Sequence, residues 1–250
     1  MKRLVTTVAI TATVLAVAGT SITASAQGIN TGNNSQNSSN YTTRQITRLS
    51  ALYESNDNPG SISSGKGDFG GKSYGAWQFS SKTGTLTEFM NYLKRENYGF
   101  YFGLIRAEYT DKNKTIQYGE KFDNVWEILA NKYPTEFYNL QMDFVKENYY
   151  DKLIRKLRRE GGYAKVINNL AVQNVLLSTA VQNGVQGAYS IVKPLKYMDS
   201  PKAFIKGIYA RRATTNSDGV LINFRSSSKE VQNAVKNRFS NEEQTALEML

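Results

Sequence analysis

The sequence predicts a mainly helical domain of the α+β class, in which two helical lobes accompany one small β-hairpin. Apolar residues recur at helical spacing through most of residues 41–250. One stretch, residues 56–72, is instead rich in Gly, Ser, Asn and Asp, and it has too few apolar residues for a helix. Because this stretch separates one helix from a block of later helices, we expect the hairpin to lie beside a cleft between the lobes.

The N-terminal residues 1–26 have the pattern of a cleaved signal peptide. Lys2 and Arg3 precede an uncharged apolar run over residues 4–18, and small residues follow at 24–26. A membrane anchor is the alternative, but Thr residues and Gly19 interrupt the run, and spanning a bilayer takes roughly 20 apolar residues. We therefore expect a secreted, extracellular protein that associates with the cell wall and has no stable membrane anchor.

The remainder of the chain divides into a linker and one domain. Residues 27–40 are almost wholly polar and have no apolar period, which predicts a flexible tether. Residues 41–250 contain no repeat and no second low-complexity break, so we interpret them as a single domain that acts as a monomer.

Within this domain the elements follow from local patterns. The first helix has an apolar face formed by Ile46, Leu49, Leu52 and Tyr53. Residues 73–79 alternate as a short strand. Later helices are predicted over residues 122–130, 137–154, 170–185, 204–209 and 231–239, and the third of these segments, 170–185, is apolar enough to lie buried in the middle of the domain.

Composition limits the chemistry that the protein can perform. The chain has no Cys and no His, which excludes disulfides, thiolate nucleophiles, imidazole bases and the usual zinc ligands. We expect neither a metal nor a cofactor. Without residues 1–26 the chain has 29 Lys and Arg against 21 Asp and Glu, a net charge of +8. Such a surface attracts polyanions, and export makes the anionic cell wall the nearest one rather than nucleic acid.

Two carboxylates are candidates for catalysis. Glu54 lies at the C-terminal end of the first helix, where the partial negative charge of the helix favours the protonated form that a general acid needs. Asp68 lies in the Gly-rich stretch that follows. An acid and a second carboxylate are the minimal equipment for glycoside hydrolysis. The alternative interpretations are a solvated helix-end residue for Glu54 and a loop-capping residue for Asp68.

A resemblance to a known family supports this pair. Residues 53–81, YESNDNPGSISSGKGDFGGKSYGAWQFSS, resemble the active-site block of lysozyme-like, chitosanase-related cell-wall hydrolases. That family includes phage endolysins and the glycosidase domain of some type VI secretion spike proteins. The resemblance continues through residues 172–184, 204–212 and 224–239. It implies a lysozyme-like fold that cleaves the β-1,4 glycan of peptidoglycan.

The resemblance also assigns roles to individual residues. It implies that Glu54 is the acid and Asp68 the base that activates water in an inverting reaction. It implies that Ser73, Tyr74, Gly75 and Gln78 line the sugar cleft, whereas Asn183 stands where a His is expected. Aromatic rings stack on sugar faces, which suits Tyr74. Strand alternation turns Trp77 away from Tyr74, so we expect Trp77 in the core. Arg212 is interpreted as the structural partner of a buried acid.

Other functions remain as alternatives. The related chitosanases make chitosan a possible substrate, although a basic enzyme is poorly suited to attract a polycation. A wall-binding domain without turnover would not need both Glu54 and Asp68. A nuclease is favoured by charge alone. The choice among muramidase, glucosaminidase and chitosanase specificity is not fixed by these residues.

Overall fold

The computed structural model describes residues 41–54, 58–63, 71–110, 116–225 and 227–250. The predicted signal peptide and linker lie outside these residues. The helices are α1 (Thr43–Glu54), α2 (Thr85–Glu96), α3 (Tyr98–Ile105), α4 (Glu120–Lys132), α5 (Pro134–Val145), the π-helix η1 (Lys146–Asp151), α6 (Lys152–Glu160), α7 (Leu170–Val192), the 3-10 helix η2 (Lys193–Leu195), α8 (Pro201–Arg212), the 3-10 helix η3 (Ile222–Phe224) and α9 (Lys229–Glu248). The strands are β1 (Ser73–Tyr74), β2 (Phe79–Ser80), β3 (Tyr109–Thr110) and β4 (Ile116–Gln117).

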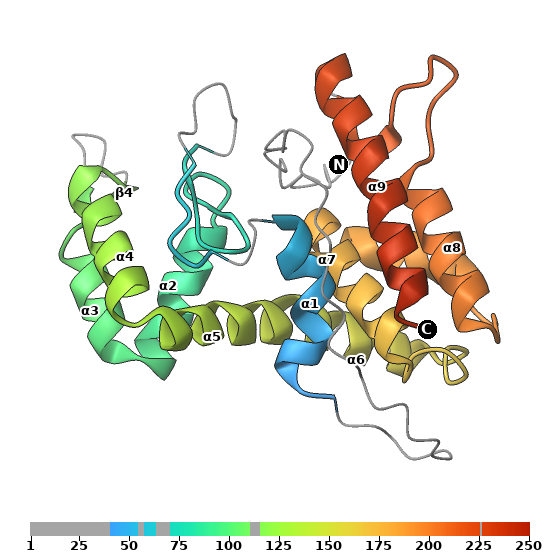
Figure 1. Cartoon of the computed structure of the whole chain (residues 1–250), viewed down its shortest axis with the longest axis horizontal. Helices are drawn as coiled ribbons and strands as arrows, with labels where there is room; N and C mark the ends of the chain where they lie inside the picture. Colours follow the sequence, from blue (N-terminus) through green and yellow to red (C-terminus); the bar gives the residue numbers. More distant parts are fainter. Residues whose placement is uncertain (1–40, 55–57, 64–70, 111–115, 226) are drawn as a thin grey trace, which may run out of the picture.

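The described helices form two groups that α5 connects (Figure 1). One group contains α2, α3 and α4, and the other contains α1, α6, α7, α8 and α9. Each pair of short strands is an antiparallel hairpin, β1 with β2 and β3 with β4. The prediction of a mainly helical α+β fold in two lobes is therefore confirmed.

Local sequence signals account for where several helices begin. Asn97, Asn169, Ser200 and Ser228 precede α3, α7, α8 and α9, and each side chain accepts a hydrogen bond from a backbone N–H in the first turn of its helix. Pro134 occupies the first turn of α5, where its missing N–H costs no helical hydrogen bond.

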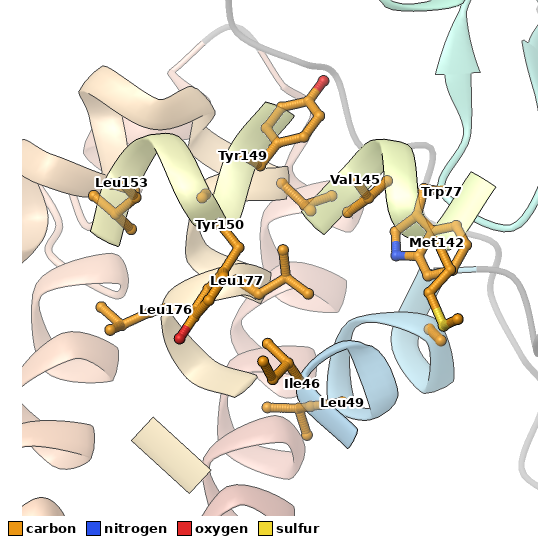
Figure 2. Packing of buried hydrophobic residues seen from close by; sticks show 14 of the residues in the cluster. Ile46, Leu49, Trp77, Met142, Val145, Tyr149, Tyr150, Leu153, Leu176 and Leu177 are labelled. Atoms are coloured by element: carbon orange, nitrogen blue, oxygen red, sulfur yellow. The ribbon is translucent and has the colours of Figure 1, made fainter. Parts of the chain in front are cut away.

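Part of the core lies where α1 and α7 pack on each other and against the segment of α5 and η1 (Figure 2). Figure 2 shows the side chains that meet there: Met142, Val145, Tyr149, Tyr150 and Leu153 from the α5, η1 and α6 segment, Ile46 and Leu49 from α1, and Leu176 and Leu177 from α7. All of these side chains are buried. The long predicted helix over residues 137–154 is thus continuous, with a π-helical turn at η1, and α7 is the buried helix that the apolar run predicted.

The structure corrects three local expectations. Residues 73–79 form a strand of two residues and a turn rather than one strand. Leu52 is 42% exposed, because the buried face of α1 is formed by residues 46, 47, 49, 50 and 51 and Leu52 lies outside it. The helices α2 and α3 were not predicted. Among the residues that the structure describes, no helix combines the length and apolar character needed to cross a bilayer.

Candidate active site

Glu54 is the last residue of α1, and the helix that carries it is fixed by side-chain hydrogen bonds along its length. The Leu49 N–H donates to Asn174 Oδ1 of α7 at 3.0 Å. Ser50 Oγ accepts from Trp77 Nε1 at 3.1 Å. Tyr53, one residue before Glu54, forms a 2.9 Å hydrogen bond with Thr245 of α9. The C-terminal end of α1 therefore has a defined position relative to α7, α9 and the β1–β2 hairpin.

The segment that follows Glu54 in the chain is attached to the other group of helices. The carbonyl oxygen of Pro59 accepts hydrogen bonds from Trp126 Nε1 of α4 at 2.9 Å and from Gln141 Nε2 of α5 at 3.0 Å. Gly60 lies so close to α4 that an added Cβ would be 2.9 Å from the Cβ of Ala130. This contact requires glycine, so Gly60 and Pro59 hold the segment against α4 and α5.

Asp68 lies outside the described residues, but the chain on both sides of residues 64–70 is described. Ser63 and Ser73 are paired, since the Ser63 N–H donates to the Ser73 carbonyl at 2.9 Å and the Ser73 N–H donates to Ser63 Oγ at 2.8 Å. Ile62 also forms a β-bridge with Tyr74. The two ends of the segment that carries Asp68 are therefore held next to each other beside β1.

Asp123 of α4 fixes this β1 edge from the other side. It forms an ion pair with Lys72 and accepts a hydrogen bond of 2.6 Å from the Tyr74 hydroxyl. The Tyr74 side chain has no exposed surface, and its ring packs against Phe122 and Trp126 at centroid distances of 5.2 Å. Burial, followed by the bond to Asp123, raises the pKa of Tyr74 far above its usual range.

The expected sugar contacts of Tyr74 and Ser73 are therefore wrong for this structure. A ring with no exposed surface offers no face to a sugar, and Ser73 is only 3% exposed. The reason is tertiary, because α4 covers the β1 strand with aromatic side chains. Trp77 is buried, as predicted, and packs on Tyr138 at 5.4 Å.

Gly75 and Gln141 explain the tight turn of the hairpin. Gly75 has a φ of 78°, and a Cβ at this position would overlap the side-chain amide of Gln141. Gln141 Oε1 accepts a 2.8 Å hydrogen bond from the Ala76 N–H. Gly75 is therefore needed for backbone packing, and it is buried rather than open to a ligand.

Gln78 differs from the other predicted sugar contacts. It is partly exposed, and it has a left-handed φ of 53°, which is uncommon for a residue other than glycine. Its Nε2 donates to the Gly75 carbonyl at 2.9 Å, whereas its buried Oε1 has no hydrogen-bond partner among the described residues. Gln78 therefore combines a left-handed backbone with a buried acceptor that lacks a partner, two features that occur at functional sites.

Comparison with known proteins assigns the chain to a family. Residues 46–243 match the family of C-terminal domains similar to that of the type VI secretion system spike protein VgrG3. The chain belongs to this family. The spike protein VgrG3 of Vibrio cholerae serotype O1 (strain ATCC 39315 / El Tor Inaba N16961) is 36% identical over 140 residues, which cover 56% of this chain. They cover only 12% of that protein, so the similarity concerns one part of a much longer spike protein.

In this VgrG3-like domain, Gln141 and Asp123 are the residues that sequence reasoning missed. Gln141 is fully buried and connects the segment after Glu54 with the hairpin turn, through Pro59 and Ala76. The sequence does contain a signal for it, because Gln141 is a polar residue within the apolar pattern of α5. No comparable signal marks Asp123, since a first-turn acid is common in helices.

Arg212 has the structural role expected from the sequence. Its Nη2 lies 3.1 Å from Glu242 Oε2 and 2.9 Å from Gln182 Oε1, and the side chains of Arg212 and Glu242 are both fully buried. Ser178 and Arg238 also contact Glu242. This cluster connects α7, α8 and α9, and its residues lie within the matched range 46–243. Asn183, where the resemblance suggested a His, donates to the Thr179 carbonyl at 3.0 Å.

The described residues contain no group of three or more His, Cys, Asp or Glu side chains that could hold a metal ion.

Proposed function

We propose that this chain is a secreted glycoside hydrolase that cleaves the β-1,4 glycan of bacterial peptidoglycan. The observation that carries the proposal is the position of Glu54 at the end of an anchored helix, directly before a segment that is fixed to α4 and α5. Membership of the VgrG3-like family supports it, because residues 46–243 match the family of domains similar to the C-terminal part of that spike protein.

Glu54 acts as the general acid in this proposal. It donates its proton to the glycosidic oxygen, so that the leaving sugar departs as an alcohol. The C-terminal partial charge of α1 disfavours an ionised carboxylate, which favours the protonated form that a general acid needs. The hydrogen bond between Tyr53 and Thr245 holds the helix end in position for this transfer.

Asp68 acts as the base that activates water. Its segment begins and ends beside β1, where Ser63 pairs with Ser73 and Lys72 pairs with Asp123. These contacts confine the seven residues 64–70 between two fixed ends. An inverting reaction requires the two carboxyl groups to stand roughly 6.5–9.5 Å apart, which leaves room for the water.

Gln78 contacts the substrate from the hairpin turn. Its Oε1 is buried without a partner, so it accepts a hydrogen bond from an N-acetyl N–H or a sugar hydroxyl once the side chain moves to expose it. The basic chain approaches the anionic wall by electrostatic attraction, and the cell wall rather than nucleic acid is its partner.

The proposal is tested by digestion of purified peptidoglycan and mass spectrometry of the new reducing ends. We expect the wild-type chain to release glycan fragments and Glu54→Gln to lose about 10²–10⁴ in rate. Glu248→Gln is the matched control, because Glu248 is the last residue of α9 as Glu54 is of α1. Retained cleavage by Glu54→Gln would refute the assigned acid.

The same digestion separates the alternatives. Release of products from chitosan but not from peptidoglycan would identify a chitosanase, and binding without any product would identify a wall-binding domain. Proton NMR of the first product tests the role of Asp68. An inverting enzyme releases the α-anomer from a β-linked glycan, so initial formation of the β-anomer would make Asp68 a nucleophile or an electrostatic stabiliser.

A further inference from the structure

The helix α3 exposes aromatic side chains that the proposed active site does not use. Tyr98 is 60% exposed and Phe102 is 46% exposed. They lie four residues apart, so both project from the same face of the helix. Their rings are stacked at 6.1 Å with an angle of 22° between the planes. Clusters of large exposed aromatic side chains are typical of interaction sites.

This face is distinct from the face by which α3 packs on the domain. Phe100 and Leu104 are buried, and Phe100 contacts Tyr133 and Phe137 at 5.2 and 5.9 Å. Tyr98 and Phe102 point away from that contact and are therefore not needed to attach α3. Figure 1 places α3 at the outer end of the α2–α4 group, away from α1. The aromatic face is thus remote from Glu54.

Charged side chains border the aromatic face, and their arrangement distinguishes among occupants. Lys94 Nζ lies 5.7 Å from the Tyr101 ring, and the Arg106 guanidinium lies 5.3 Å from the Phe102 ring. Neither cation has a carboxylate within 4.0 Å among the described side chains. Both can therefore pair with a carboxylate of a ligand, as the carboxylates of the peptidoglycan polymer would allow.

Two carboxylates lie near the start of α3. Glu96, two residues before Tyr98 in the chain, is exposed and forms an ion pair of 3.7 Å with Arg95, and Glu136 accepts a 2.8 Å hydrogen bond from Asn97, which precedes α3. These carboxylates would repel the headgroups of an anionic membrane, whereas they can accept hydrogen bonds from sugar hydroxyls. The mixed charge thus favours a glycan over a lipid surface.

We propose that Tyr98 and Phe102 form a secondary glycan-binding surface that holds a peptidoglycan strand away from the site of cleavage. The exposed rings stack on the apolar faces of sugar rings, Glu96 accepts from hydroxyls, and Lys94 and Arg106 bind carboxylates of the polymer. This inference rests on the proposed function for the identity of the polymer. It predicts a surface that long, insoluble glycan engages and that a short, soluble fragment does not need.

The test compares binding and turnover in the full chain. Tyr98→Gln/Phe102→Gln should weaken cosedimentation with purified sacculi by about tenfold, which corresponds to about 1.4 kcal/mol, and should leave kcat/KM for short soluble glycans within about twofold. The matched control is Tyr197→Gln/Ile222→Gln, because these residues are 77% and 38% exposed in the other group of helices. Its binding should equal that of the wild type.

Additional variants and ligands identify what binds to this surface. Lys94→Gln/Arg106→Gln should weaken binding to sacculi but not to uncharged chitin. Equal binding of sacculi by Tyr98→Gln/Phe102→Gln and its control would overturn the inference, as would a loss confined to phosphatidylglycerol vesicles. If the double variant unfolds, Tyr98→Gln alone provides the same comparison. Sacculus binding through α3 without any product release would refute the proposed hydrolysis while supporting this surface.

Discussion

Replacing Arg212 by Met should destabilise the domain strongly, because it leaves the carboxylate of Glu242 buried without its main partner. Both side chains are fully buried, and Arg212 Nη2 lies 3.1 Å from Glu242 Oε2. Breaking a buried pair costs about 3–5 kcal/mol. The lower end of this range applies, since Arg238 and Ser178 would still contact Glu242. At about 2–4 °C per kcal/mol for a domain of this size, Tm should fall by about 6–12 °C.

The control is an exposed pair with the same geometry. Arg95 Nη2 lies 3.1 Å from Glu147 Oε1, but these side chains are 55% and 51% exposed. Arg95→Met should therefore cost less than about 1 kcal/mol. Urea unfolding of both variants, and of Arg212→Met/Glu242→Leu, completes the comparison. The double variant should recover to within about 1 kcal/mol of the wild type, because no unpaired charge remains buried.

The result that would refute this reasoning is a similar small loss for both single variants. It would mean that Glu242 is solvated or protonated without Arg212, and that burial does not determine the strength of the pair. A double variant as unstable as Arg212→Met would instead assign the loss to packing, since the guanidinium also lies 4.8 Å from the Tyr209 ring and 4.6 Å from the Phe239 ring.

Three further predictions concern pH, backbone strain and salt. Burial raises the pKa of Glu108 to about 7. The folded state therefore binds an extra proton between about pH 4.5 and 7, and the free energy of unfolding falls as pH rises through that window. Glu108→Gln should raise Tm relative to wild type at pH 8 but not at pH 4. Gln78→Gly should raise the free energy of unfolding by about 1 kcal/mol, because it removes a left-handed side-chain conformation, while the lost amide raises KM for soluble glycans by about 3–10-fold. Equal free energies of unfolding for Gln78→Gly and the wild type would show that the left-handed conformation of Gln78 is not strained. Raising ionic strength from about 0.1 to 1 M should weaken binding to whole walls more than it lowers turnover of soluble glycans. Equal loss of both would contradict a targeting role for the net charge.

Helical periodicity was sufficient to predict most of the fold, because each signal lies within one helix. The apolar patterns of α1, α4, α5 and α7 recur at helical spacing along elements of 12 to 23 residues, and the structure confirms these helices. The helix α2 has the same pattern, since Leu86, Phe89, Met90 and Leu93 are all buried, so the sequence contains a signal for this helix as well.

Alternation over residues 73–79 was a weaker guide, because seven residues fit both a strand and a tight hairpin. The turn at Gly75 and Gln78 needs two positive φ angles, which shorten β1 and β2 to two residues each. Nothing within residues 73–79 indicates that α4, about 50 residues later in the chain, covers Tyr74. The assignment of Tyr74 to a sugar-stacking role therefore failed for a tertiary reason that local patterns do not contain.

The two proposed catalytic carboxylates belong to segments that are attached to different groups of helices. Their relative position therefore depends on the contacts between these groups. The helix that ends at Glu54 packs on α7, whereas the ends of the Asp68 segment are fixed by α4 through Asp123. The hydrogen bond from Trp77 to Ser50 joins the hairpin directly to α1. Gln141 joins the same hairpin to the segment after Glu54. The buried side chains of Trp77 and Gln141 therefore connect the hairpin to α1 and to the segment after Glu54, and we expect their replacement to alter the relative position of the two proposed carboxylates.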